Sequence, residues 1–337
     1  MNDGLKPYAK NAAEMLIPGK GKKKISVTAS TVMLILFIIL AMTIVNPGAF
    51  WKISNMSIII DRATVLLMLG LGLTFVLLSS SVNLSIGGML SLNSILVAAL
   101  SVTLGFWTIP VVLIISFLEG CVTGVVFTRF RIPSFIATFG MMGIFSSLAI
   151  IVSPTGSAMI IHRSLMRVLN VFRAEVFPGS GFKVMWLIAL IIFSVFLFIN
   201  KRTAFGKHVA AIGNSPEAVR YSGLNIDRVK IICYGLSGLS AGLGAIFLCS
   251  SQFTGDPTVG TPYTILIIAT VIVGGTSLSG GSGGVFNTLL GALTIAVSEN
   301  AMIVLGINVF YHQIMIGAIM ILAVALSLDK ERVLVVK

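Results

Sequence analysis

The sequence predicts an all-α fold: a polytopic bundle of about ten transmembrane helices with both termini in the cytoplasm. Three observations predict it. Of 337 residues, 56% are hydrophobic and only 10% are charged, with a mean hydropathy of +1.05, whereas a soluble domain carries about 25% charged residues. The apolar residues form runs long enough to cross about 30 Å of hydrocarbon. The basic residues gather on one side of the resulting topology, as the positive-inside rule requires.

The apolar runs divide the chain into a basic N-terminal tail (1–25), a transmembrane domain (26–328) and a short C-terminal tail (329–337). The first run has no small-residue cleavage site behind it, so we expect a signal anchor and not a removable signal peptide. The predicted spans are 26–45, 56–80, 86–105, 108–129, 133–152, 183–200, 231–250, 263–278, 284–305 and 309–328.

Ten crossings with both ends inside place 17 of the 23 Lys and Arg residues on the cytoplasmic side. An odd number of crossings would split these basic clusters between the two faces. The topology leaves two hydrophilic connections, an external loop at 153–182 and a cytoplasmic loop at 201–230.

The net charge of +12 could indicate nucleic-acid binding. However, the basic residues flank apolar spans, and no groove-reading or base-stacking module is recognisable. We therefore expect lipid headgroups, and not nucleic acid, as their partners. His162, His208 and His312 lie far apart in the sequence, so neither a metal site nor a cofactor is predicted.

The cytoplasmic loop contains the signature of a short helix. Ser215 is a good N-cap, Pro216 suits the first helical position and Glu217 complements the positive helix end. Ala218 continues the turn, and Gly223 can end it in the left-handed conformation. The pattern fits an ordinary capped helix in a connecting loop as well as a functional element.

Several stretches carry a more specific signal. They are AFGKHVAAIGNSPEAVRYSGLNIDRVK at 204–230, YGLSGLSAGLGAIF at 234–247, VGGTSLSGGSGG at 273–284, SVNLSIGG at 81–88 and RIPSFIATFGMMGI at 131–144. In these stretches, which extend over roughly residues 50–328, the chain resembles the permease subunits of ATP-binding-cassette (ABC) importers of the ribose/xylose/galactose class.

The resemblance implies a subunit of the bacterial plasma membrane that imports a small polar solute, such as a monosaccharide or related polyol. It implies three protein partners: a separate ATP-hydrolysing subunit, an extracytoplasmic solute-binding protein and a second permease, either a copy or a paralogue. The chain itself lacks the G-x-x-x-x-G-K-[ST] phosphate loop and is not expected to be an enzyme. The residues that the resemblance assigns to ATPase coupling are Ser215, Pro216, Glu217, Ala218 and Gly223.

The chain departs from the family pattern at three positions. Relatives carry Gly-Gly-Ile-Asp-Leu-Ser where this chain has residues 80–85, and Gly-Tyr-Glu-Leu-Asp where it has 262–266. Three customary acids are thereby replaced by Asn83, Thr264 and Leu266. These replacements bear on the solute, the gating or the docking of partners.

Two Gly- and Ser-rich stretches, SSSVNLSIGG and GGTSLSGGSGG, interrupt the apolar runs and are each followed by an Asn in the next span. Broken helices of this kind can place hydrogen-bonding groups on a polar translocation path. Small residues also serve close helix packing, and both interpretations stay open here. The candidate path residues are Asn83, Ser85, Asn93, Thr276, Ser277 and Asn287.

Acids inside apolar spans are costly and mark functional candidates. Asp61 is next to Arg62 near the outer face, where mutual compensation or access to water would explain both charges. Glu119 and Glu299 lie deeper, where we expect structural pairing or a cavity-facing position. Alternatively, the chain is a secondary transporter driven by an ion gradient, with Glu119 or Glu299 as its coupling acid.

Overall fold

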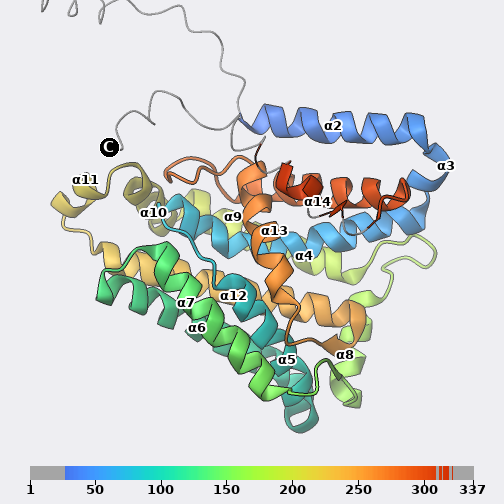
Figure 1. Cartoon of the computed structure of the whole chain (residues 1–337), viewed down its shortest axis with the longest axis horizontal. Helices are drawn as coiled ribbons and strands as arrows, with labels where there is room; N and C mark the ends of the chain where they lie inside the picture. Colours follow the sequence, from blue (N-terminus) through green and yellow to red (C-terminus); the bar gives the residue numbers. More distant parts are fainter. Residues whose placement is uncertain (1–26, 309–310, 313, 319–320, 322–337) are drawn as a thin grey trace, which may run out of the picture.

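The computed structural model describes residues 27–308, 311–312, 314–318 and 321, and this part of the chain is a helical bundle with one two-residue strand pair (Figure 1). The predicted tails 1–25 and 329–337 and most of the tenth predicted span, 309–328, lie outside the described residues. The helices are α2 (Val27–Val45), α3 (Pro47–Phe50), α4 (Ile53–Leu78), α5 (Ile86–Leu104), the 3₁₀ turn η1 (Gly105–Trp107), α6 (Thr108–Phe130), α7 (Ser134–Val152), α8 (Arg163–Arg173), α9 (Val184–Arg202), α10 (Ala204–Asn214), α11 (Pro216–Tyr221), α12 (Ile226–Gln252), α13 (Gly260–Val273) and α14 (Val285–Val304).

The loops that connect the helices lie at two opposite ends of the bundle. At one end, the loop after α4 contacts the end of α10 and the loop after α13, through Ser80 and its partners Gly213 and Ser279. At the other end, β1 (Ala158–Met159) pairs antiparallel with β2 (Thr254–Gly255). In Figure 1, α10 and α11 lie at the left end and α3 and α8 at the right. The predicted inner and outer loops therefore occupy different faces.

The core is formed by α4, α5 and α12, which pass through the centre of the bundle and bury most of their side chains. Small residues bring their backbones together, because a Cβ built on Gly72 of α4 would lie 2.1 Å from the Leu236 carbonyl oxygen of α12. Gly238 of α12 approaches the Ser116 carbonyl of α6 in the same way, at 2.0 Å. Such close contacts are typical of helices that associate in lipid.

Outer helices present apolar side chains to the surroundings. Phe37 of α2, Ile114 of α6 and Ile191 of α9 are each more than half exposed. A soluble protein does not leave many large apolar side chains in water, so these faces are suited to the hydrocarbon of a membrane.

Six helical runs in the described residues are long and apolar enough to cross a membrane, with α5, η1 and α6 counted as one run, Ile86–Phe130. That run contains two predicted spans, and Gly105, with φ of +55°, stands between them. Ala29–Val45 and α13 are shorter apolar helices. A membrane helix bundle is therefore confirmed, whereas the count of ten spans and the position of the termini stay predictions.

The two hydrophilic connections contain helices that were not predicted. The external loop 153–182 contains α8, and the cytoplasmic loop 201–230 contains α10 as well as the predicted short helix. The eighth predicted span, 263–278, is displaced, because α13 begins at Gly260 and ends at Val273. Gly275, with φ of +109°, turns the chain out of the helix at this point.

Candidate coupling site and polar centres in the membrane

The short helix in the cytoplasmic loop forms as its sequence predicts. The Ser215 hydroxyl accepts a hydrogen bond from the Ala218 amide at 3.4 Å, and Pro216 takes the first helical position. Gly223 follows with φ of +80°, the left-handed conformation expected after a helix end. Within α11, Val219 is 9% exposed and anchors the helix to the bundle.

The rest of α11 points away from the bundle. Pro216, Glu217, Ala218 and Arg220 are exposed, and Tyr221 is 91% exposed. An aromatic side chain left so open is an unusual surface feature, and aromatic residues are enriched among the anchors of protein interfaces. No sequence signal singles out Tyr221 within the short helix.

Immediately before α11, the end of α10 touches both Gly- and Ser-rich loops. The Ser80 hydroxyl lies 3.0 Å from the Gly213 carbonyl oxygen and 2.6 Å from the Ser279 carbonyl oxygen. The Gly281 amide donates to the Leu78 carbonyl at 3.0 Å. We call these five residues the coupling junction. It joins α10 directly to the inner ends of α4 and α13.

The coupling junction has no room for larger side chains. A Cβ on Gly213 would lie 1.9 Å from the Leu78 carbonyl oxygen and 2.3 Å from the Gly281 amide nitrogen. These are backbone atoms, so they cannot move aside as a flexible side chain could. The end of α10 is therefore packed tightly against the end of α4 and the loop after α13.

The two loops begin with the same backbone geometry. After α4, the Ser80 amide donates to Leu77 and the Ser81 amide to Val76; after α13, the Gly275 amide donates to Ile272 and the Thr276 amide to Val271. Both ends are Schellman motifs, in which a residue with positive φ closes the helix. Ser80 adopts φ of +55° without being glycine, a conformation that its hydrogen bonds in the coupling junction help to hold.

The candidate path residues fall into three separate places. Asn83 and Ser85 lie together and are fully buried: the Asn83 side-chain oxygen accepts from the Ser85 amide at 3.0 Å and hydroxyl at 2.6 Å. The Asn83 amide group donates to the Ser237 hydroxyl of α12 at 3.0 Å. The Asn that replaces the customary acid therefore ties the loop to a core helix.

The residues of the second loop do not meet Asn83. Thr276 is buried, and its hydroxyl accepts from the Gly284 amide at 3.3 Å, which closes the loop at its base. Ser277 and Asn287 are half-buried. The backbone of Asn287 passes so close to Gly274 that a Cβ there would lie 2.0 Å from its carbonyl oxygen. These contacts serve packing, and a path-lining role for this set stays a prediction.

The third place is in the middle of the bundle. The Asn93 amide group of α5 donates to a Glu119 carboxyl oxygen of α6 at 2.6 Å and to the Met89 carbonyl at 2.8 Å. Asn93 is fully buried and Glu119 is 7% exposed. The second carboxyl oxygen of Glu119 and the side-chain oxygen of Asn93 are buried and have no hydrogen-bond partner among the described residues. Sequence reasoning had selected both residues but not their contact.

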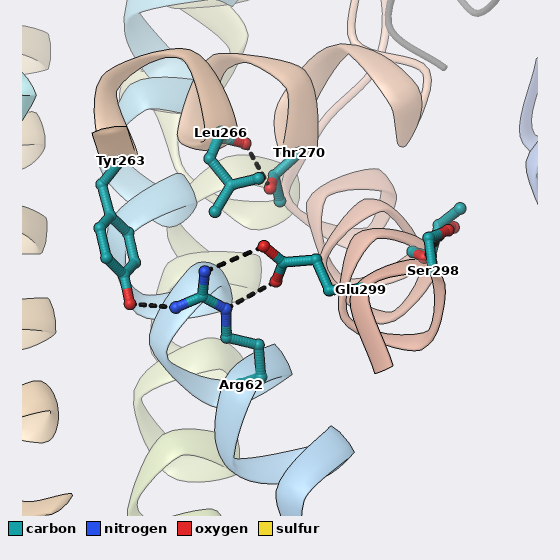
Figure 2. A network of polar contacts seen from close by, with 7 residues as sticks. Arg62, Tyr263, Leu266, Thr270, Ser298 and Glu299 are labelled. Atoms are coloured by element: carbon teal, nitrogen blue, oxygen red, sulfur yellow. Dashed lines mark hydrogen bonds and ion pairs between the residues drawn. The ribbon is translucent and has the colours of Figure 1, made fainter. Parts of the chain in front are cut away.

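Glu299 is paired with Arg62, as Figure 2 shows. The Arg62 guanidinium of α4 donates to both carboxyl oxygens, from Nε at 2.6 Å and from Nη2 at 3.0 Å, and it also donates to the Tyr263 hydroxyl of α13. Its Cζ lies 4.7 Å from the Tyr263 ring centroid. The network connects α4, α13 and α14, so the expected structural pairing of Glu299 is confirmed.

Asp61 does not compensate Arg62, contrary to the expectation from their adjacency. Its carboxylate accepts from the Lys183 ammonium and from the Trp186 indole, the latter at 2.9 Å. Neighbouring residues of a helix point in directions about 100° apart, so Asp61 and Arg62 face different helices. One faces α9 and the other α14.

On the outer face, α8 lies with its apolar side against the bundle. Leu165 and Leu169 are fully buried, whereas Arg163 and Arg167 are exposed on the opposite side. Among the described residues, the ion pairs are Arg62–Glu299 and Asp61–Lys183, so neither of these two arginines is neutralised by an acid there. Arg173 stacks over the Phe253 ring at 5.0 Å.

Asp256, in the turn before α13, has a lowered pKa. Partial burial alone would raise the pKa, but hydrogen bonds from the Thr258 amide at 2.7 Å and hydroxyl at 2.8 Å outweigh it. These bonds favour the charged carboxylate.

Comparison with known proteins decides the family. The family model described as the permease component of branched-chain amino acid transport systems matches residues 55–324, which include the coupling junction and the polar centres. The chain belongs to this permease family.

Individual relatives of this permease are ribose and xylose permeases. It is 30% identical over 300 residues to the ribose import permease protein RbsC of Haemophilus influenzae, covering 86% of this chain and 90% of the relative. It is also 30% identical to RbsC of Bacillus subtilis, over 87% and 90% of the two chains. The xylose transport system permease protein XylH of Escherichia coli is 28% identical, over 88% and 91%. No solved structure matches the chain.

The permease is therefore a membrane component of an ABC importer and a multi-pass protein of the inner membrane. Its relatives are transporters and not enzymes.

Proposed function

We propose that this permease imports a monosaccharide or a related polyol and is driven by ATP hydrolysis in a separate subunit that binds α11. A solute-binding protein delivers the solute at the outer face, and a second permease completes the transmembrane unit. The observation that carries the coupling role is the coupling junction, because it connects the exposed helix α11 to the inner ends of two core helices.

The coupling role rests on two complementary features of the α10–α11 segment. Glu217 and Tyr221 are free to contact another protein, whereas Gly213 is locked against the backbone of the bundle. A partner that moves α11 would therefore move α10 and the two loops with it. Tightly packed elements transmit such shifts because they have discrete arrangements.

The sugar assignment comes from the relatives, whose names state ribose and xylose. The described core agrees with a neutral solute. A zwitterionic amino acid carries two opposite charges that need partners when buried, and Arg62 is already engaged with both oxygens of Glu299. That engagement also gives no support to Glu299 as the coupling acid of an ion-driven transporter.

For the solute-binding protein, α8 is the proposed docking element. Its apolar side is covered by the bundle, so Arg163 and Arg167 point away from it, on the side that the predicted topology makes extracytoplasmic. Acidic side chains on the lobes of the binding protein would complement them and accelerate association at low ionic strength.

The coupling assignment is tested with the double variant Glu217→Lys/Gly223→Pro in vesicles that contain the permease and its ATPase subunit. Lys reverses the charge at the helix N-terminus, and Pro cannot adopt the positive φ of residue 223. We expect ATP-driven uptake and retention of the ATPase to fall together. Unchanged uptake with a fully retained ATPase would show that this segment does not couple the two subunits.

The matched control is Glu175→Lys. It makes the same charge change on an exposed acid of the outer connection, and it leaves ATPase retention unchanged if the partner binds only at the α11 face.

A further inference from the structure

The Asn93–Glu119 pair is a polar centre without a structural explanation. It lies near the middle of α5 and α6, among helices that are otherwise joined by small residues. Nothing in the described residues provides Glu119 with a basic partner. Polar groups at this depth cost several kcal/mol unless they are compensated.

The atoms of the pair that lack hydrogen-bond partners among the described residues are both side-chain oxygens. The Asn93 amide nitrogen already donates hydrogen bonds to the Met89 carbonyl and to one carboxyl oxygen of Glu119. What remains is the Asn93 side-chain oxygen and the second Glu119 carboxyl oxygen, which are buried and have no partner in the part of the chain that the structure describes. Both oxygens can accept hydrogen bonds and a protonated carboxyl can also donate one, so a ligand with hydroxyl groups, which donate and accept, fits both.

The neighbouring hydroxyl groups of α6 already make hydrogen bonds within the helix. The Ser116 hydroxyl donates to Leu113 at 3.0 Å, and the Thr123 hydroxyl donates to the Glu119 carbonyl at 2.9 Å. Their hydrogen atoms are engaged one turn before and after Glu119. Within one turn of Glu119 on α6, the described residues hold no other buried side-chain oxygen that lacks a hydrogen-bond partner.

We propose that Asn93 and Glu119 form a binding site for adjacent hydroxyl groups of the transported polyol. A vicinal diol supplies two O–H donors, one for each free oxygen. Burial makes such bonds strong and makes their absence costly, so the site favours a hydroxyl-bearing solute over an apolar one. This inference rests on the proposed sugar transport and adds the residues that recognise the solute within the membrane.

A double substitution distinguishes a role of the pair in solute binding from a role in the stability of the fold. In Asn93→Leu/Glu119→Leu both polar partners are replaced by apolar side chains of similar size, a change that is often neutral or stabilising in a buried pair. We expect the thermal stability of the purified permease to be maintained and ATP-driven D-ribose and D-xylose uptake to fall about tenfold. Ser116→Ala, one turn away with a satisfied hydroxyl, is the control and leaves uptake unchanged.

Direct contact is measured by infrared difference spectroscopy on the permease–ATPase complex in nanodiscs. The carboxyl band of Glu119 is assigned by its loss in Glu119→Gln, and we expect it to shift on addition of D-ribose or D-xylose but not of L-leucine. ATP-driven uptake of either sugar with an unmoved Glu119 band, or with full activity in the double variant, would overturn this inference and leave the proposed function standing. Absence of ATP-driven uptake of both sugars in the wild type would overturn the proposed function and this inference with it.

Discussion

At the scale of single residues, the coupling junction depends on backbone contact that only glycine permits. Gly213 is helical, so its importance does not come from a special φ value. It comes from the Leu78 and Gly281 backbone atoms that occupy the place of a Cβ. A larger residue must separate α10 from both loops, because neither backbone can rotate away as a side chain does.

Gly213→Ala is therefore expected to destabilise the folded permease by about 1–3 kcal/mol and to reduce coupled uptake more than ATPase binding, since α11 itself is intact. Thermal unfolding and vesicle uptake measure the two effects. Gly48→Ala in α3 is the control, because a Cβ there meets nothing within 4 Å. Equal behaviour of the two variants would contradict the role assigned to the junction.

Arg62 holds the outer ends of three helices together. Arg62→Leu leaves the Glu299 carboxylate, which is 12% exposed, without its cation, and we expect a loss of about 2 kcal/mol of stability. The combined variant Arg62→Leu/Glu299→Leu should recover most of it, because no unpaired charge remains. Thermal melts of the four members of this cycle provide the test; additive losses would show that the two residues do not interact.

The turn at Asp256 should depend on pH. Its folded-state pKa is lowered, so its stabilisation is present above the ordinary value near 3.8 and is lost as the pH falls through the folded-state value. Hydrogen exchange of the Thr258 amide should show protection that decreases below about pH 4. Protection in Asp256→Ala that matches the wild type would refute this assignment.

At the scale of elements, α11 combines one buried anchor, Val219, with an exposed surface that ends in Tyr221. Its local sequence contains every signal that the structure uses: the Ser215 cap, Pro216 at the first position and Gly223 after the end. Short helices defined by caps can be predicted, because the deciding contacts lie within a few residues.

Other elements could not be placed from sequence in the same way. The eighth span was predicted to reach residue 278, because Thr276 and Ser277 carry no charge and hardly interrupt an apolar run, whereas the Schellman turn at Gly275 ends α13 five residues earlier. The helix α10 was missed, although Val209 and Ile212 form a narrow buried side.

The pairings of the polar centres were the least predictable part of the candidate site. Arg62 and Glu299 are 237 residues apart, and Asn93 and Glu119 are 26 apart. No local pattern links such residues; tertiary packing alone brings them together. Sequence reasoning could identify each as an unusual polar residue in a span, but it could not name the partners.

Tyr221→Ala tests α11 as an interface with little cost to the fold, since the side chain is 91% exposed. We expect weaker retention of the ATPase subunit, by about tenfold in affinity, as for an aromatic interface anchor. Co-purification across a salt series measures it. Phe177→Ala, which removes an exposed aromatic at the outer end, should have no effect, and an equal loss in both variants would argue against a specific interface.

At the scale of the whole molecule, the two ends of the bundle differ in what they offer to partners. The inner end carries α11 and the coupling junction, and the outer end carries the arginines of α8 and the Arg62 network. The ends are joined by α4, α5 and α12, which form the buried centre. We propose that this arrangement converts movement at one face into a change of access at the other.

The most direct test of the account is uptake of radiolabelled D-ribose and D-xylose by vesicles that contain the permease and its ATPase subunit, with the loaded binding protein outside. The account predicts uptake that requires ATP inside the vesicle and all three proteins, and that persists when the proton gradient is dissipated. Uptake driven by a proton gradient, without ATP and without the ATPase subunit, would contradict it.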